Sequence, residues 1–354
     1  MAKGAVMTIR DVARESGYSA STVSIVLNNA PLSRYIPADT KLRIETTARR
    51  LGYRPNPLAR SLRSQRSNVV GVMVFDITDP YCTPILRGIE NSLYQGNYLS
   101  LLADAHNEPR RFERYLEMLL DRRVEGLIVI ANWLVMDIKL LADLTRKQVP
   151  TVIVGREIDI DTVSTVAVDN EAGASTALEH LYNLGHRDIA FIRGPKSLSS
   201  SGQRWKGVKS FAQSAKIILE PKRIAELPES LDPNSSFEAG ANLTGELLRR
   251  GGLFTALMAF DDMTALGALR ALKKKSVRVP EDCSVIGFDD VAQAALAVPS
   301  LSTVRQPMES MGTLSAGIIL DAISGAEQKR DFAPSRRRVP AELVARESTR
   351  PIAK

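Results

Sequence analysis

Residues 8–28 constrain the fold most, because their pattern predicts two short helices joined by a tight turn. Thr8 is followed three residues later by Asp11, the spacing of a capping box that satisfies the free backbone N–H groups of a helix start. Gly17 supplies the backbone freedom that the turn needs. Two such helices form a helix-turn-helix, a motif that places its second helix in the major groove of DNA.

Apolar residues recur at helical spacing through this segment. Ser19 is placed to cap the second helix, on which Ala20, Ser21 and Ser24 are predicted to point outward and to allow close approach to bases and phosphates. A third helix is predicted over residues 37–51, because the proline that starts this stretch is favoured in a first helical turn. The inward-facing residues of the first two helices are predicted to be Ile9, Val12, Ala13, Val23, Val26 and Leu27.

On periodicity alone, any small amphipathic helical hairpin fits this segment equally well, and the charge distribution decides between the two interpretations. The whole chain has 354 residues and a formal net charge of +7. Residues 1–66 contain twelve Lys and Arg against four Asp and Glu, so the rest of the chain is close to neutral. A basic field confined to the helical segment is what the neutralisation of DNA phosphates requires.

The helix-turn-helix segment resembles the LacI/GalR family of bacterial transcription regulators, and the resemblance continues through residues 51–63 and across the rest of the chain. Many short pieces occur in the order and spacing of the family, so the match is more specific than a single motif. These pieces are residues 70–72, 76–81, 87–90, 125–128, 169–170, 180–181, 184–187, 192–195, 261–263, 279–282, 285–290 and 301–304.

From residue 69 onward, short apolar runs alternate with amphipathic helical stretches, which is typical of parallel sheets flanked by helices. The resemblance implies an N-terminal all-α helix-turn-helix domain and an α/β core of two parallel-sheet subdomains, of the type I periplasmic-binding-protein kind. The basic run 336–338 is predicted to be a solvated loop. The expected domains are residues 1–55 (DNA binding), 56–66 (hinge helix or linker) and 67–354 (effector-binding and dimerisation core), with one subdomain at 67–168 and 306–328 and the other at 169–305 and 329–354.

Two departures from the family pattern bear on DNA recognition. Ile25 stands where the family often has a basic residue, so readout of a guanine by arginine is not expected there. Residues 29–36 form a connection a few residues longer than usual, and Arg34 and Tyr35 in it are either extra phosphate contacts, which we favour, or part of a surface loop. The predicted DNA contacts are Thr8, Ser19, Ala20, Ser21, Thr22, Ser24, Ile25, Asn28, Arg34, Tyr53, Asn56, Ala59, Leu62 and Arg63.

Residues 56–63 resemble the hinge helix of the family, which is too short to be stable alone. Pro55 and Pro57 let a helix start only after them. In the family this helix becomes ordered on operator DNA and inserts a leucine into the minor groove, and Leu62 matches that leucine by position. The alternative is an ordinary linker with Leu62 packed on the core.

Ligands bind parallel sheets at the carboxyl ends of the strands, so the loops that follow the apolar runs are candidate sites. Arg204 matches the arginine that typically holds a ligand hydroxyl or carboxylate in the family, and Tyr81 matches a residue that flanks the ligand. The alternative for Asp261 and Asp289 is that they only cap the helices that follow them, and the two roles can coexist. The predicted effector-binding residues are Asp76, Tyr81, Asn132, Trp133, Arg156, Ser200, Arg204, Asp261 and Asp289.

An enzyme is not expected, because no metal-like His and Cys spacing and no phosphate-binding glycine loop occurs in the sequence. We therefore expect no catalytic residue, no metal and no cofactor. The two cysteines, Cys82 and Cys283, lack a paired spacing, which suits a reducing cytoplasm. The N-terminus has no apolar signal segment and no apolar run reaches membrane-spanning length, so a cytoplasmic bacterial protein with no membrane partner is expected.

The sequence therefore predicts a sequence-specific DNA-binding transcription regulator, in the first place a repressor whose operator affinity is controlled by a small-molecule effector. A homodimer on a pseudo-palindromic operator is expected, and a dimer is preferred over a tetramer because no heptad repeat follows Pro351. The expected effector is a sugar or sugar derivative, with purines and nucleosides as alternatives. A ligand-dependent activator, a corepressor-type regulator and a pure sugar-binding receptor stay as alternative functions.

Overall fold

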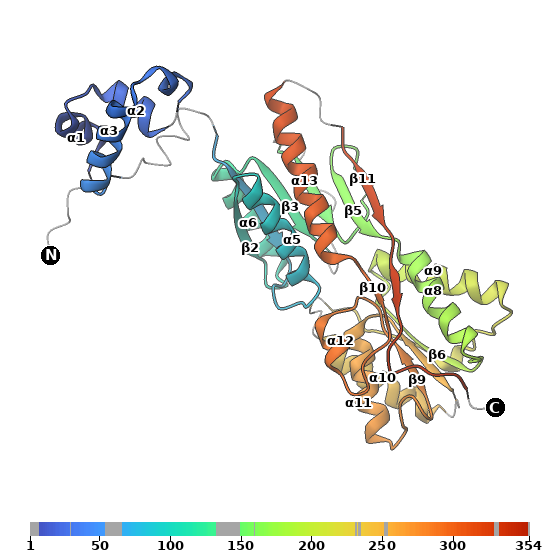
Figure 1. Ribbon diagram of the computed structural model, residues 1–354. Helices are drawn as coiled ribbons and strands as arrows, with labels where there is room; N and C mark the ends of the chain where they lie inside the picture. The colour runs from blue at the N-terminus through green and yellow to red at the C-terminus, as the bar shows by residue number, and fades with distance from the viewer. Residues whose placement is uncertain are drawn as a thin grey trace. The chain divides into compact units, whose positions relative to one another are not determined.

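The chain divides into two compact units, Met1–Ser67 and Asn68–Lys354, which we call the head and the core. Figure 1 shows the head as a small group of helices and the core as helices packed on sheets. Of the helices within the described ranges, none combines the length and the hydropathy needed to span a bilayer. The computed structural model describes residues 7–28, 30–53, 66–131, 149–158, 160–230, 232, 235–250, 254–328 and 333–352.

The described part of the head is helical throughout, as the sequence predicts. Val12, Val23 and Ile44 are fully buried at its centre, and Val26 and Ala48 are nearly so. Each of the three described α-helices of the head thus contributes at least one side chain to the hydrophobic centre of the head. The elements are α1 (Ile9–Ser16), α2 (Ala20–Leu27), the 3-10 helix η1 (Pro31–Tyr35) and α3 (Ala38–Arg50).

Local hydrogen bonds fix the turn between α1 and α2. Asp11 accepts hydrogen bonds from the backbone N–H (2.9 Å) and the hydroxyl (2.7 Å) of Thr8, and these bonds hold the pKa of its carboxyl below the ordinary value. Gly17 ends α1 with φ of +79°, a left-handed conformation that other side chains rarely adopt. Ser19 then caps α2 by accepting a hydrogen bond from the backbone N–H of Thr22 at 3.1 Å.

The first sheet of the core is parallel, in the order β11-β5-β4-β3-β1-β2. The helices α5 (Cys82–Gln95) and α13 (Met308–Glu327) cover one face, and α6 (Pro109–Asp121) covers the other. Because both faces are covered, the inner strands β3 and β4 are buried along their whole length and are mostly apolar. The strands are β1 (Val69–Val74), β2 (Leu99–Asp104), β3 (Gly126–Ile130), β4 (Thr151–Val154), β5 (Ser164–Val168) and β11 (Arg336–Val339).

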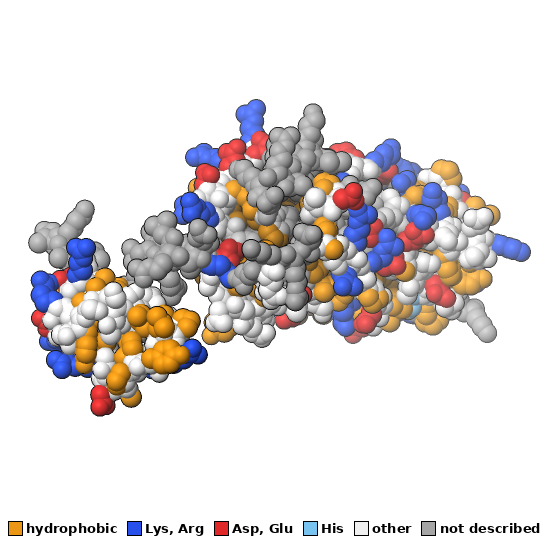
Figure 2. Space-filling model, turned by 90° about the horizontal axis from the view of Figure 1, so that it is seen from above, with side chains coloured by type: hydrophobic (Ala, Val, Ile, Leu, Met, Phe, Trp, Pro, Cys, Tyr) orange, Lys and Arg blue, Asp and Glu red, His pale blue; other side chains and the backbone are white. Residues whose placement is uncertain are grey.

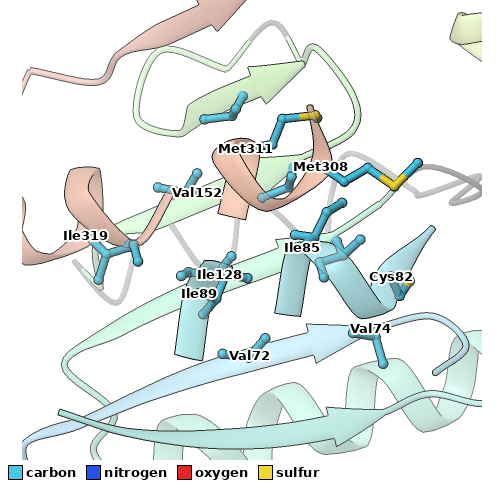
Figure 3. Packing of buried hydrophobic residues seen from close by; sticks show 14 of the residues in the cluster. Val72, Val74, Cys82, Ile85, Ile89, Ile128, Val152, Met308, Met311 and Ile319 are labelled. Atoms are coloured by element: carbon cyan, nitrogen blue, oxygen red, sulfur yellow. The ribbon is translucent and has the colours of Figure 1, made fainter. Parts of the chain in front are cut away.

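The contact between α5 and α13 is unusually close because glycines lie in it. A Cβ on Gly88 would stand 2.0 Å from the carbonyl oxygen of Glu309, and one on Gly312 would stand 2.1 Å from the carbonyl oxygen of Ile85. Figure 3 shows Ile85 and Met311 with their neighbours filling the space between these two helices and the strands. The two segments, more than 200 residues apart in the chain, therefore form one packed layer.

The second sheet is also parallel, in the order β7-β6-β8-β9. The helices α8 (Asn170–Asn183) and α9 (Ser199–Ser214) pack on one face, and α10 (Ser235–Arg249) and α11 (Asp262–Lys274) pack on the other. The remaining elements are β6 (Ile189–Arg193), η2 (Pro221–Arg223), β7 (Ile224–Glu226), β8 (Ala256–Ala259), β9 (Ser284–Ile286), α12 (Ala292–Leu296) and the antiparallel pair β10 (Thr303–Arg305) and β12 (Glu342–Val344).

Strand β11 corrects two of our predictions. Residues 329–354 were assigned to the second subdomain, yet β11 pairs with β5 of the first sheet, with Arg338 opposite Ala167. The basic run 336–338 was predicted to be a solvated loop, yet it forms this strand. An edge strand tolerates arginine because the charged ends reach solvent while the backbone completes the sheet.

Candidate DNA interface and ligand pocket

The face of α2 that points away from the core of the head carries most of the predicted base contacts. Val23 and Val26 occupy the buried side of the helix. Short hydroxyl and amide side chains are therefore presented on the other side, where such groups can bond base edges or phosphates. On this side Ala20, Ser21 and Asn28 are exposed, and Thr22, Ser24 and Ile25 are half-buried.

Hydrogen bonds hold the polar side chains at both ends of α2. At its start the hydroxyls of Ser19 and Thr22 lie 2.9 Å apart. At its end Asn28 Nδ2 donates to the carbonyl oxygen of Ser24 at 2.9 Å and to its hydroxyl at 3.2 Å. The groups predicted to meet DNA are thus oriented before any DNA binds.

The longer connection after α2 is an ordered 3-10 helix. Ser33 is buried beneath it, while Arg34 and Tyr35 are exposed, with the guanidinium 4.7 Å from the ring centre. Thr8 is exposed at the start of α1, and Tyr53 packs against the core of the head. Figure 2 shows one face of the head, on which Lys and Arg side chains outnumber Asp and Glu. The predicted contacts Asn56, Ala59, Leu62 and Arg63 lie outside the described residues.

A polar pocket lies in the core, at the carboxyl ends of strands from both sheets. Gly155 follows β4 of the first sheet, and Phe260 and Asp289 follow β8 and β9 of the second. This placement agrees with the general position of ligand sites on parallel sheets. Its described lining is Tyr81, Gly155, Asn170, Leu198, Ser200, Arg204, Phe260, Asp261, Asp289 and Gln306.

Arg204 is the centre of the pocket. Its guanidinium stacks on the ring of Phe288 at 3.6 Å and lies 4.7 Å from the ring centre of Phe260. Its Nε donates to Asn170 Oδ1 at 2.8 Å, Nη1 donates to the carbonyl oxygen of Phe260 at 2.6 Å, and Nη2 donates to Asp289 Oδ1 at 3.3 Å. The arginine is therefore fixed in position, since three of its N–H groups have hydrogen-bond partners and two aromatic rings lie against it.

Asp289 faces Arg204 in a strained backbone conformation, with φ of +122°. Its Oδ1 also accepts a hydrogen bond from Gln306 Nε2 at 2.6 Å. Burial raises the pKa of Asp289 to about 7, because desolvation and the neighbouring Asp261 outweigh the attraction of Arg204. Within the described residues its Oδ2 has no hydrogen-bond partner, so this oxygen is available to a ligand.

Asp261 and Tyr81 complete the polar lining. Asp261 Oδ1 caps α11 by accepting a hydrogen bond from the backbone N–H of Thr264 at 2.7 Å, and burial raises the pKa of this carboxyl. The capping role that we considered for Asp261 is confirmed, and the same residue also lines the pocket. Tyr81 is 4% exposed, burial raises the pKa of its phenol, and its hydroxyl has no hydrogen-bond partner among the described residues.

The structure brings five of the predicted effector contacts together and leaves others apart. Asp76 accepts hydrogen bonds from Thr78 and Asn107, which hold the pKa of its carboxyl below the ordinary value although burial raises it. Arg156 follows Gly155 without lining the described pocket, and burial lowers the pKa of its guanidinium. The five predicted effector contacts that line the pocket together are Tyr81, Ser200, Arg204, Asp261 and Asp289. Asn132 and Trp133 lie outside the described residues.

Sequence reasoning missed several lining residues. Asn170 and Gln306 both bond members of the Arg204–Asp289 pair, and Phe260 stacks on the arginine. The position of Asn170 two residues after the end of β5, next to the helix-capping Asp169, was the available signal. Gln306 gave no such signal, because it lies in the crossover before α13.

A basic helix-turn-helix head and a two-sheet core with a polar pocket define a ligand-binding transcription regulator. Residues 8–56 match the family described as bacterial regulatory proteins, lacI family, and residues 178–349 match the periplasmic binding protein-like domain. The chain belongs to the LacI family of bacterial transcription regulators.

Full-length relatives support this assignment. The chain is 31% identical over 352 residues to the HTH-type transcriptional repressor PurR of Haemophilus influenzae (strain PittEE), covering 98% of this chain and 99% of the relative. It is 29% identical over 346 residues to the HTH-type transcriptional repressor CytR of Escherichia coli (strain K12), covering 98% and 97%.

Solved structures resemble the whole chain as well. The lac repressor dimer bound to operator and the anti-inducer ONPF has a TM-score of 0.81 and 27% identity, covering 97% of this chain and 99% of that one. The transcriptional regulator CelR in complex with cellobiose has a TM-score of 0.71 and 28% identity at the same coverage.

Proposed function

We propose that this protein is a repressor whose affinity for operator DNA changes when a neutral, hydroxyl-rich molecule binds the core pocket. The buried Arg204–Asp289 pair carries this proposal. It offers a fixed donor group and a fixed acceptor group side by side, which is an arrangement suited to two neighbouring hydroxyls. Similar solved structures hold cellobiose and ribose, which makes a carbohydrate the first choice for the effector.

The charge of the pocket disfavours an anionic effector. Two acidic side chains, the buried Asp261 and the half-buried Asp289, line it, and three of the N–H groups of Arg204 already have protein partners. A phosphate group placed there would meet like charge in a poorly solvated site. A neutral sugar or a nucleoside instead supplies hydroxyl donors to the carboxylate oxygens.

On the DNA side, we propose that residues 1–55 of the head form the DNA-binding domain and read one half-site with the outward face of α2. Ser21 and Asn28 supply the exposed hydrogen-bonding groups, and Arg34 supplies a phosphate contact. Residues 56–66 form the proposed hinge, with Leu62 as the minor-groove wedge. Residues 67–354 form the proposed effector-binding and dimerisation domain.

We further propose that the protein works as a homodimer on a pseudo-palindromic operator. The edge strand β2 exposes 64% of Leu99 and 43% of Leu102, and the end of α5 exposes 79% of Tyr94. An apolar edge of this kind is usually covered by a partner, and a second copy of the chain is the partner we propose. We assign no catalytic activity, since the relatives are named as repressors.

The test is DNA binding by the full-length protein to its own upstream region at fixed salt, alone and with D-ribose, cellobiose, cytidine, adenosine, hypoxanthine or ribose 5-phosphate. We expect a protected pseudo-palindrome whose affinity falls with one neutral compound and not with ribose 5-phosphate. Affinity that rises instead would identify a corepressor-type regulator. Specific binding that no compound alters would contradict the effector half of the proposal, and absence of specific binding would contradict the DNA half.

A further inference from the structure

A continuous chain of polar contacts runs from Arg204 in the pocket to the edge of the first sheet. Arg204 Nε donates to Asn170 Oδ1 at 2.8 Å, and Asn170 Nδ2 donates to Gln203 Oε1 at 3.0 Å. Gln203 Nε2 donates to Glu157 Oε2 at 3.4 Å. Glu157 accepts two hydrogen bonds from Arg338, from Nε at 2.8 Å and from Nη2 at 3.0 Å. We call these five residues the relay.

The relay joins elements of both sheets. Glu157 lies after β4 and Arg338 lies on β11, both in the first sheet, whereas Gln203 and Arg204 lie on α9, which packs on the second sheet. Asn170 is the first residue of α8, at the point where the chain passes from one sheet to the other. The contact between Gln203 and Glu157, the longest of the series, is the one that spans the two subdomains.

The hydrogen-bonding pattern leaves the two amides little choice of orientation. Asn170 is 4% exposed, its oxygen faces a guanidinium that can only donate, and its NH₂ group therefore faces Gln203. Gln203 must then present its oxygen to Asn170 and its NH₂ group to Glu157, which can only accept when ionised. Arg204 at one end of the relay and Glu157 at the other therefore require the same orientation of both amides.

We propose that Gln203 and Glu157 are positioning residues for Arg204, which they hold in the orientation that presents its remaining N–H groups to the effector. This inference rests on the proposed function, because it is the effector role of Arg204 that makes its orientation matter. The relay also ties that orientation to the relative position of the two subdomains, because one of its contacts crosses between them.

The test measures the accessibility of Arg204 in the full-length protein without effector or DNA. Phenylglyoxal, an arginine-specific reagent, is added, and the rate of modification of each arginine is followed by peptide mass spectrometry. In Q203A and in E157A we expect Arg204 to react about three- to tenfold faster than in the unmodified chain, the change that corresponds to one lost hydrogen bond. The double variant is expected to react no faster than the faster single variant, because both changes cut the same relay.

Asp188→Ala is the matched control. Asp188 is a carboxylate in the same core and bonds Arg223 at 2.6 Å, outside the relay. D188A should speed the modification of Arg223 and leave Arg204 unchanged. E157Q, which keeps an oxygen acceptor, should restore part of the protection of Arg204.

Two outcomes would overturn the inference. One is an unchanged rate at Arg204 in both Q203A and E157A. The other is a faster rate at all arginines together, which would mean general loosening rather than positioning. Because no effector or operator is present, neither outcome depends on whether the proposed repressor function is correct.

Discussion

In the head, several side chains predicted to meet DNA are exposed and make few bonds beyond their own helix, whereas in the core pocket the central pair Arg204 and Asp289 is largely removed from solvent and bonded to neighbours. Ser21 and Asn28 stand in solvent at the surface of a basic unit. Arg204 and Asp289 are 11% and 14% exposed and bond each other. Binding of DNA by the head should depend on long-range charge, whereas binding of a ligand in the pocket should depend on desolvation and fixed geometry. The two sites should therefore respond to different solution conditions.

Salt should separate the two sites most strongly. Raising the salt concentration from about 50 to about 200 mM should weaken operator binding by about a thousandfold, because released counterions oppose the phosphate contacts of the head. Effector binding to the buried pocket should change by less than about twofold over this range. Fluorescence anisotropy with operator DNA and calorimetry with the effector would measure the two curves. Equal salt dependence of operator affinity and effector affinity would contradict the predicted difference between the two sites.

Removing the arginine of the pocket should have the next largest effect. Arg204→Met should weaken effector binding about a hundredfold, because Asp289 loses its buried partner. Operator affinity in the absence of effector should stay the same. Arg223→Met is the matched control, since it removes an arginine from another ion pair of the core. Equal losses of effector affinity in the two variants, or a loss of cooperative thermal unfolding in R204M, would argue against a specific role.

The contrast between the two regions also explains what the sequence could predict. The helices of the head were predictable because capping residues and helical spacing are local signals, and they were confirmed at Thr8, Gly17 and Ser19. Most core strands were predictable as apolar runs. Strand β11 was missed because its arginines are charged and its pairing with β5, some 170 residues earlier, is a tertiary interaction.

The pocket was predictable only in part, for a related reason. Residues directly after strands, such as Arg156, Asp261 and Asp289, were visible as candidates, and only two of these three line the described pocket. The partners of Asp289 could not be inferred, because Gln306 reaches it across the crossover between the sheets. A hydrogen bond such as that between Gln306 and Asp289 depends on the tertiary structure, which local sequence patterns do not specify.

A pH titration should sharpen the comparison. Because the pKa of Asp289 is raised to about 7, the carboxylate that accepts ligand hydroxyls forms only as the pH rises through that value. Effector affinity should therefore increase about tenfold between pH 6 and pH 8, while the salt-controlled operator affinity stays nearly constant. Calorimetry across this range would measure the effect, and D289N should abolish the pH dependence.

The same raised pKa gives a stability prediction of opposite sign. Between the ordinary carboxyl pKa of 3.8 and about 7, the folded chain holds a proton on Asp289 that the unfolded chain releases. The contribution of this group to the free energy of unfolding must then fall as the pH rises through that window. Thermal unfolding of the unmodified chain and of D289N would show the difference. A pH profile identical in the two proteins would mean that Asp289 does not titrate there.

The smallest predicted effect concerns the 3-10 helix after α2, which belongs to one of the two departures from the family pattern. Arg34→Gln should weaken binding about threefold and reduce the salt slope by about 1, equally for operator and unrelated DNA, because a phosphate contact carries no sequence information. Arg249→Gln, which removes an exposed arginine from the core, should change neither quantity. If R34Q instead weakened binding to operator DNA but not to unrelated DNA, Arg34 would contact base edges rather than a phosphate. If it changed nothing, the longer connection would be a surface loop, and the electrostatic contrast between head and pocket would rest on the remaining basic residues.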